Sequence, residues 1–198
     1  NQNEMDSAPA LQGMRYNNLV AGNTWFSFLP VIVAPGRTVR VLTARLIISF
    51  QDSLLLFNTI ETINAGPQFT YQNRVRYSRI GNALDTNSFL APDGTDGNLL
   101  DNSGTTEAII GAEFLKNRLI VFYEQSTWEL VYTGNLQSPF RWQQINTELG
   151  VESTFSVVPF DKIVMGIGNT GVHACNGSNV ERIDHLIPNV VFEIRNDN

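Results

Sequence analysis

The sequence has little charge and almost no lysine. Charged residues make up 16% of the 198 residues, against about 25% in typical soluble domains, and only Lys116 and Lys162 are lysines. Asparagine is abundant instead, with 21 residues, which predicts a surface made polar by neutral amides. Such a surface suits turn-rich all-β proteins and also chains that are contacted by other protein. The net charge of −6 argues against a basic stripe for phosphate groups, so we expect no sequence-specific nucleic-acid binding.

Cysteine and histidine are too scarce for most metal and redox sites. The single cysteine, Cys175, excludes an internal disulfide, and its place within a predicted strand favours a buried, inert thiol over a nucleophile. The two histidines, His173 and His185, have no metal-ligand spacing with Cys175 or with each other. His173 lies two residues before Cys175, so on a strand both side chains point to one face, where we expect packing rather than a metal site.

Long apolar runs and helical periodicity are also missing. No apolar run reaches the roughly 18 residues of a membrane-spanning helix, and no basic segment precedes an apolar one as in a secretory signal. Apolar residues do not recur at helical spacing between caps, so we expect no helix. The chain contains no G-x-S-x-G, Walker A or G-x-G-x-x-G motif, and we predict that it is not an enzyme and binds no cofactor.

Acidic and aromatic residues raise three alternative functions: calcium binding, sugar binding and glycosidase activity. The spacing of Asp93, Asp96 and Asp101 in the loop 91–106 fails the EF-hand pattern for calcium and indicates a surface loop. Four aromatics could stack on sugars or pack between neighbouring sheets, and we expect packing: Trp128, Tyr132, Phe140 and Trp142. Six glutamates could supply the carboxylate pair of a glycosidase: Glu107, Glu113, Glu124, Glu129, Glu148 and Glu152.

What the sequence does contain is short β-branched and aromatic runs between turn residues, most clearly in residues 107–144. The expected strands are 108–114, 118–123, 127–133 and 140–142, and the second is apolar enough for burial on both faces. In the third strand Trp128, Leu130 and Tyr132 share one face, the period of two of a half-buried strand. These residues predict one four-stranded antiparallel blade.

The same order of strands and turns recurs on both sides of this blade. Downstream we expect strands at 153–160, 163–167, 172–175 and 180–183, with Asn176-Gly177-Ser178 as a hairpin turn rather than a glycosylation site. Upstream we expect strands at 38–42, 45–50, 54–57 and 74–80, with insertions at 65–72 and 91–106. The turn residues Asp52, Asn117 and Asp161 are 65 and 44 positions apart, and the second spacing matches a propeller blade of about 40–50 residues.

We therefore predict an all-β fold of β-propeller-like antiparallel blades, a partial propeller or a fragment of a longer one. Residues 1–16 are expected to form an extended N-terminal arm, and residues 17–198 the propeller-like domain, with blades near 43–90, 107–146 and 153–184. Residues 17–33 are interpreted as the remnant of an earlier blade. Pro188 should end the last blade, with residues 190–194 beginning another element.

Four stretches that together cover somewhat over half of the chain resemble the β-propeller virion proteins of tailed bacteriophages. They are residues 73–85, 111–135, 139–162 and 168–184. The resemblance implies a structural subunit of the tail-tube, nozzle or packaged-DNA-stabilisation type, located in the virion tail or neck and made in the bacterial host cytoplasm. Members of that group are several times longer than this chain.

The partners that the resemblance implies are other virion proteins, namely portal, adaptor or tail subunits, together with further copies of the chain in a homo-oligomeric ring. The ring would surround the DNA channel at the head-tail connector and serve DNA ejection, with DNA passing close to an acidic wall. The alternative is a tail-associated propeller that binds or degrades host glycans.

Overall fold

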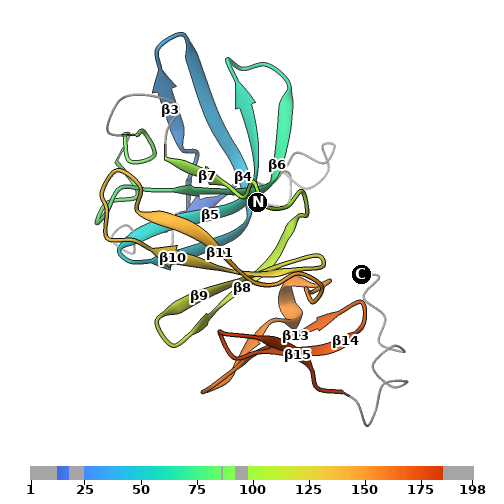
Figure 1. Ribbon diagram of the computed structural model, residues 1–198. Helices are drawn as coiled ribbons and strands as arrows, with labels where there is room; N and C mark the ends of the chain where they lie inside the picture. Colours follow the sequence, from blue (N-terminus) through green and yellow to red (C-terminus); the bar gives the residue numbers. More distant parts are fainter. Residues whose placement is uncertain (1–12, 18–24, 86, 92–97, 185–198) are drawn as a thin grey trace.

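The computed structural model describes residues 13–17, 25–85, 87–91 and 98–184, whose regular structure is β-strand apart from one 3-10 turn. Three antiparallel sheets follow one another along the chain, and within each the neighbouring strands are consecutive in sequence (Figure 1). This up-and-down order is that of a propeller blade, so the predicted all-β, propeller-like fold is confirmed. The described residues contain no α-helix, as expected.

The first sheet is longer than the sequence predicts. It contains β3 (Val31–Ala34), β4 (Arg37–Phe50), β5 (Ser53–Ile63), β6 (Gln68–Tyr77) and β7 (Leu99–Asp101). The strands expected at 38–42 and 45–50 are one strand, β4, and residues 65–72 are not an insertion, because from Gln68 on they belong to β6. Threonines such as Thr43, Thr59 and Thr62 extend the ladder, since β-branched side chains favour strands although they are polar.

Two predictions about the beginning and end of this sheet are also corrected by the structure. β3 pairs with β4, so residues 31–33 belong to the first sheet and are not the remnant of an earlier blade. The loop 91–106 contains β7, which pairs with β6 and places Asp101 opposite Arg74. Asp93 and Asp96, the other two aspartates of the calcium alternative, lie outside the described residues.

The second sheet follows the sequence closely. Its strands are β8 (Ile109–Leu115), β9 (Arg118–Tyr123), β10 (Thr127–Tyr132) and β11 (Phe140–Asn146). The first three agree with prediction to within one residue, because each is an apolar run bounded by turn residues. The β8–β9 turn contains Lys116 with a positive φ of 58°, and β11 continues past the predicted end at residue 142.

The third sheet contains β12 (Val158–Pro159), β13 (Val164–Gly168), β14 (Gly171–Cys175) and β15 (Val180–Arg182). Its last three strands and the turn at Asn176-Gly177, where Gly177 has φ 86°, match the prediction. The strand predicted at 153–160 is wrong over most of its length. Ser156 donates from both its backbone N–H and its hydroxyl to the carbonyl of Ser153, which closes the 3-10 turn η2 (Thr154–Ser156) and leaves only two residues for β12.

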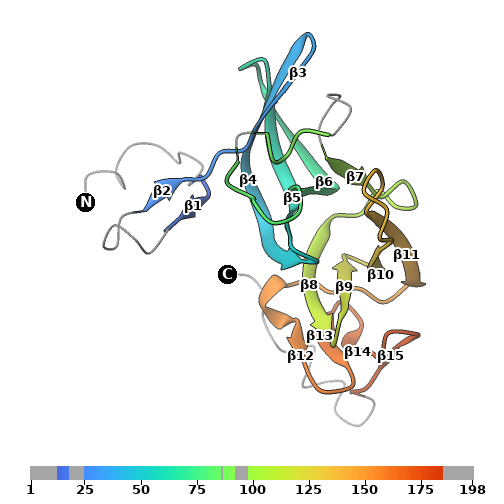
Figure 2. The same ribbon diagram turned by 90° about the vertical axis from the view of Figure 1, so that its left-hand side faces the viewer.

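A short hairpin of β1 (Arg15–Tyr16) and β2 (Phe26–Ser27) lies beside the three sheets (Figure 2). Met14, predicted to belong to the extended arm, is buried in the core on the outer side of the first sheet. Residues 1–12 of that arm lie outside the described residues, as do His185, Pro188 and the element predicted at 190–194.

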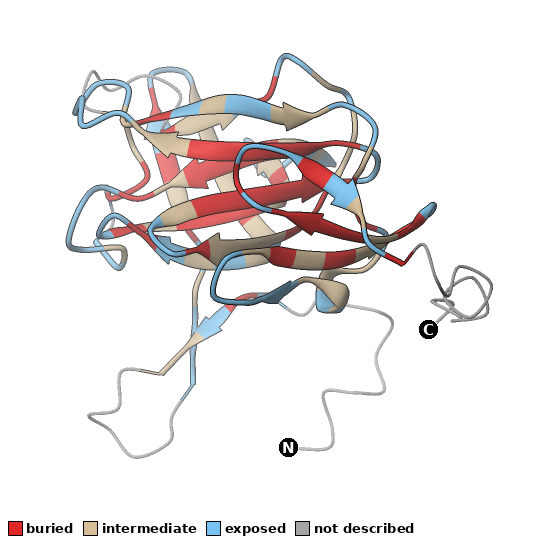
Figure 3. Ribbon diagram, turned by 60° about the horizontal axis from the view of Figure 1, so that its bottom comes forward, coloured by how far each residue is buried: buried red, intermediate tan, exposed pale blue. Residues whose placement is uncertain are grey.

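β9 is buried on both faces, as its sequence predicts. Figure 3 shows buried residues gathered along the inner strands of the sheets and exposed residues mostly at the turns. Leu119, Val121 and Tyr123 pack toward the first sheet, whereas Ile120 and Phe122 pack toward the third. The predicted shared face of Trp128, Leu130 and Tyr132 is confirmed, because all three belong to the core between the first and second sheets. Phe140 and Trp142 join them there, so these aromatics pack between sheets.

An ion network lies on the other face of the first sheet, where the sequence predicts no special feature. The carboxylate of Glu61 accepts two hydrogen bonds from Arg76 at 2.6 and 2.7 Å and one from Arg74 at 3.2 Å. Arg74 also forms a two-point ion pair with Asp101 and lies 3.6 Å above the ring of Tyr71. The Glu61 and Arg76 side chains are 1% and 0% exposed, so these charges depend on one another rather than on water.

Candidate functional site

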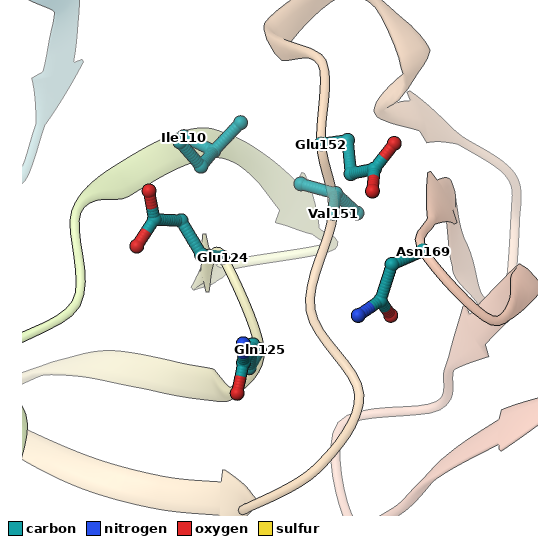
Figure 4. Close-up of a pocket in the computed structure, with 6 residues that line it drawn as sticks. All are labelled: Ile110, Glu124, Gln125, Val151, Glu152 and Asn169. Atoms are coloured by element: carbon teal, nitrogen blue, oxygen red, sulfur yellow. The ribbon is translucent and has the colours of Figure 1, made fainter.

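A pocket of about 380 Å³ opens between the second and third sheets (Figure 4). Its lining comes from β8, the β9–β10 turn, the connection that follows β11 and the β13–β14 turn: Ile110, Glu124, Gln125, Val151, Glu152 and Asn169. In an up-and-down sheet every second turn lies at the same end, so adjacent blades bring these turns together. Glu124 and Glu152 are among the candidate carboxylates that the sequence offers, whereas Gln125 and Asn169 lie in predicted turns and carry no sequence signal of a site.

The carboxylates of the pocket do not converge on a common point. Figure 4 shows the carboxyl groups of Glu124 and Glu152 pointing to opposite sides of the pocket. Glu124 accepts a hydrogen bond from the backbone N–H of Ala108 at 3.3 Å. Glu107 in turn accepts bonds from the Gln125 backbone N–H and the Ser126 hydroxyl. Glu107 and Glu124 thus tie the start of β8 to the β9–β10 turn.

The other glutamates that the sequence offered for a glycosidase lie apart from this pocket. Glu113 accepts from the backbone N–H of Phe114, and Glu129 forms an ion pair with Arg118. Glu148 is exposed, in the segment that follows β11. Four of the six carboxylates thus make separate contacts. Among the residues that the structure describes, no three or more His, Cys, Asp or Glu come together in a group that could hold a metal ion.

His173 lies behind the pocket and joins the connection to the β13–β14 turn. Its Nδ1 is 2.8 Å from the carbonyl oxygen of Gly150, and its Nε2 is 2.7 Å from the Thr170 hydroxyl. A carbonyl can only accept, so Nδ1 carries the proton and Nε2 accepts from Thr170. Both ring nitrogens are thus in use, and the predicted packing role of His173 agrees with its complete burial.

We expect acid to weaken the seam between the second and third sheets through His173. Burial lowers the pKa of His173 below 6.5, and the hydrogen bond to the Gly150 carbonyl opposes this only in part. As pH falls, the unfolded chain therefore binds the proton first. Stability should be full above about pH 6.5 and fall below it by up to about 1.4 kcal/mol per pH unit, until the lower folded pKa is reached.

Urea unfolding between about pH 7.5 and 5.5 measures how stability changes with pH. This pH interval lies above the range where ordinary carboxylates titrate. His173→Asn is the matched variant, because an asparagine amide can donate to the Gly150 carbonyl but does not titrate. It should unfold with a shallower pH slope than the natural chain. If both proteins lost stability equally with falling pH, this pH dependence could not be assigned to His173.

Further contacts fix the second sheet against its neighbours. Arg118 of β9 holds Glu129 and also donates to the carbonyl of Gly177 in the β14–β15 turn. Arg45 of β4 donates to the carbonyl of Ile110 and to the hydroxyl of Thr154, so one side chain contacts segments associated with all three sheets. These bonds cross between the sheets and hold them in one fixed arrangement.

The seam between the second and third sheets is also closely packed around small residues. A Cβ added at Gly111 would lie 2.6 Å from the Val157 side chain, and one added at Gly166 would clash with Val151. Cys175 is fully buried in the same seam, and burial raises the pKa of its thiol, in agreement with the predicted inert cysteine.

The third sheet has a second face, turned away from this seam, which we call the open face. The pairings of β12 to β15 place the following residues on it: Val158, Met165, Ile167, Val172, Ala174, Glu181 and Ile183. Six of the seven are apolar: Val158 and Ile183 are 45% and 42% exposed, Met165, Ile167 and Val172 are half-buried, and Ala174 is buried. The face thus resembles the inner faces of the sheets in composition, although no other described sheet packs on it.

The fold and these surfaces define a class: an all-β protein of stacked, propeller-like antiparallel sheets, with rigid seams between the sheets and an apolar face at one end. No protein-family model matches the chain, and no curated protein matches it. None of the residues that the structure describes forms a helix of the length and apolarity needed to cross a membrane.

Proposed function

We propose that this chain is a ring-forming structural subunit in the tail or neck of a tailed-bacteriophage virion. The observation that carries the proposal is the open face, an apolar sheet surface that another protein surface would cover. Exposed apolar area of this kind marks sites of protein association. The cross-sheet bonds of Arg45 and Arg118 support a mechanical role, because a subunit that sets ring geometry must hold its own sheets rigidly.

The phage setting follows from the sequence resemblance alone. In that setting the net charge of −6 would let DNA pass along the ring without adhering to it, since phosphate groups are repelled by an acidic wall. Portal, adaptor or tail subunits would then bind the upper and lower rims of the ring.

The glycan-binding or glycan-degrading alternative receives less support from the geometry. A sugar site of that type would place two carboxylates about 5–10 Å apart beside exposed aromatics. Here the carboxyl groups of Glu124 and Glu152 diverge, whereas Trp128 and Phe140 are buried in the core. The double variant Glu124→Gln/Glu152→Gln would test the alternative directly, by loss of any glycan binding that the natural chain has.

The native mass of the purified chain in solution tests the proposal. We expect light scattering to give a defined multiple of the 22.1 kDa chain mass, and electron microscopy to show closed rings with a central opening. A particle of 22.1 kDa at every accessible concentration would contradict the proposed assembly. The particle should not bind duplex DNA at low salt, so it should not slow the migration of the DNA in a gel.

A further inference from the structure

The turn between β14 and β15 contains the one Asn-Gly pair of the sequence, Asn176-Gly177. In such a pair the backbone nitrogen of the glycine can attack the side-chain carbonyl carbon of the asparagine and form a cyclic succinimide. Glycine allows this ring closure because it has no Cβ to obstruct the approach. The predicted hairpin turn is therefore also a place where the chain can modify itself.

The folded turn presents the Asn176 side chain in a form that favours this attack. The Oδ1 atom of Asn176 accepts hydrogen bonds from the backbone N–H groups of Ser178 and Asn179, both at 2.9 Å. The attack places negative charge on this same oxygen, so the two N–H groups stabilise the transition state as the donors of an oxyanion hole do. Asn176 is exposed, so ammonia can leave to solvent and water can enter.

The attacking nitrogen is held by a weak hydrogen bond. The backbone N–H of Gly177 donates to the sulfur of Cys175 at 3.4 Å, and a thiol sulfur is a weak acceptor. Little stabilisation is therefore lost when this nitrogen gives up its proton and bonds to the side-chain carbonyl carbon of Asn176. A main-chain carbonyl as acceptor would oppose the reaction more strongly.

Asn146 provides a comparison within the same chain. Its Oδ1 accepts from the backbone N–H groups of Glu148 and Leu149, both at 2.8 Å, which is the same pattern of donors. The residue after it is Thr147, whose β-branched side chain obstructs the approach of the backbone nitrogen. The side-chain oxygens of Asn146 and Asn176 are thus bonded alike, but the residues that follow them differ.

We propose that Asn176 is a site of spontaneous deamidation in the folded protein. The Gly177 nitrogen loses its proton and bonds to Cγ of Asn176. The Cγ–Nδ2 bond breaks, and the amino group leaves as ammonia with the proton that Gly177 gave up. One water molecule then opens the succinimide, at Cγ to give aspartate or at the main-chain carbonyl carbon to give isoaspartate. Water is the only other reactant, and the reaction is independent of the ring proposed above.

The two products have different consequences for the seam between the second and third sheets. Aspartate keeps an acceptor oxygen for the N–H groups of Ser178 and Asn179. Isoaspartate directs the main chain through its side chain and lengthens it by a methylene group, which displaces the Gly177 carbonyl. That carbonyl accepts from Arg118 of β9, so isoaspartate breaks a hydrogen bond between the two sheets.

Incubation of the natural, folded chain in mildly alkaline buffer, followed by peptide mass mapping, tests the proposal. We expect Asn176 to acquire the mass of the deamidated form several-fold faster than Asn146, with fragmentation locating the site. An isoaspartyl methyltransferase assay should identify isoaspartate. Asn176→Ser removes the reacting amide and should lose this product, whereas the control Asn146→Ser should keep it.

Ion-exchange chromatography separates the isoaspartyl form by its added negative charge, so its stability can be compared. Amides of β15 should exchange faster in this form, whereas freshly purified Asn176→Asp, which represents the aspartyl product, should exchange like the unmodified chain. Deamidation at Asn176 that is no faster than at Asn146 overturns the proposal, and so does deamidation that occurs only in the urea-unfolded chain. An isoaspartyl form that exchanges like the unmodified chain overturns the effect on the seam.

Discussion

Replacing Glu61 with glutamine is expected to lower the free energy of unfolding by about 3–5 kcal/mol, because one partner of a buried ion network disappears. Arg76 is 0% exposed and would keep its charge without the carboxylate that compensates it. For a chain of this length the melting temperature should fall by about 6–20 °C. Thermal and urea unfolding of the two proteins measure the effect.

Two controls separate the network from charge removal in general. Glu148→Gln removes an exposed carboxylate and should change stability by less than about 0.5 kcal/mol. Asp101→Asn removes the partly exposed end of the same network, whose side chain is 44% exposed, and should cost about 1 kcal/mol or less. If Glu61→Gln were no more harmful than Glu148→Gln, the buried network would not be needed for stability.

The same carboxylate should contribute to acid unfolding. Burial acts to raise the pKa of Glu61, but the hydrogen bonds from Arg76 and Thr59 and the charges of Arg76 and Arg74 outweigh it, so the pKa lies below 4.5. A lowered folded pKa gives stability that is present above about pH 4.5 and lost as pH falls through the folded value. Glu61→Gln lacks this carboxylate, so its stability should depend less on pH in that acid range.

Replacing Gly150 with alanine is expected to destabilise the protein by about 3 kcal/mol and to loosen the third sheet from the second. An added Cβ would clash with the Tyr123 carbonyl oxygen and lie 2.6 Å from the backbone N of Gln125. Backbone atoms cannot move aside as a side-chain end can, so the connection itself must shift, and overpacking of this kind costs about 1–3 kcal/mol or more. The shift would also strain the bonds of Val151 to Tyr123 and of His173 to Gly150.

Hydrogen exchange locates this effect as well as measuring it. Amides of β13 and β14 should exchange faster in Gly150→Ala, whereas those of β4 and β5 in the first sheet should change less. Gly13→Ala is the control, because an added Cβ there meets only the Leu42 carbonyl oxygen at 3.8 Å. Unchanged exchange in the third sheet would show that Gly150 does not hold the seam.

Several elements could be read from the amino-acid sequence because their signals are local. β9 is a run of apolar residues between turn residues, so its length and its burial on both faces follow from neighbours along the chain. The hairpin at Asn176-Gly177 follows from the left-handed backbone that glycine adopts easily. The first sheet was harder to predict from the sequence. Its threonines and arginines are polar, and they belong to β4, β5 and β6 only because these strands pair with one another.

The contacts between sheets depend on how the twisted sheets stack, and local pattern carries little information about that. His173 of the third sheet meets Gly150 across 23 residues in sequence, and Arg45 of the first sheet meets Thr154 across 109. The pocket likewise combines turns from two sheets. Composition and periodicity thus specify most strands and the all-β class, whereas the ion network depends on the register between neighbouring strands and the glycine contacts on packing between segments distant in sequence.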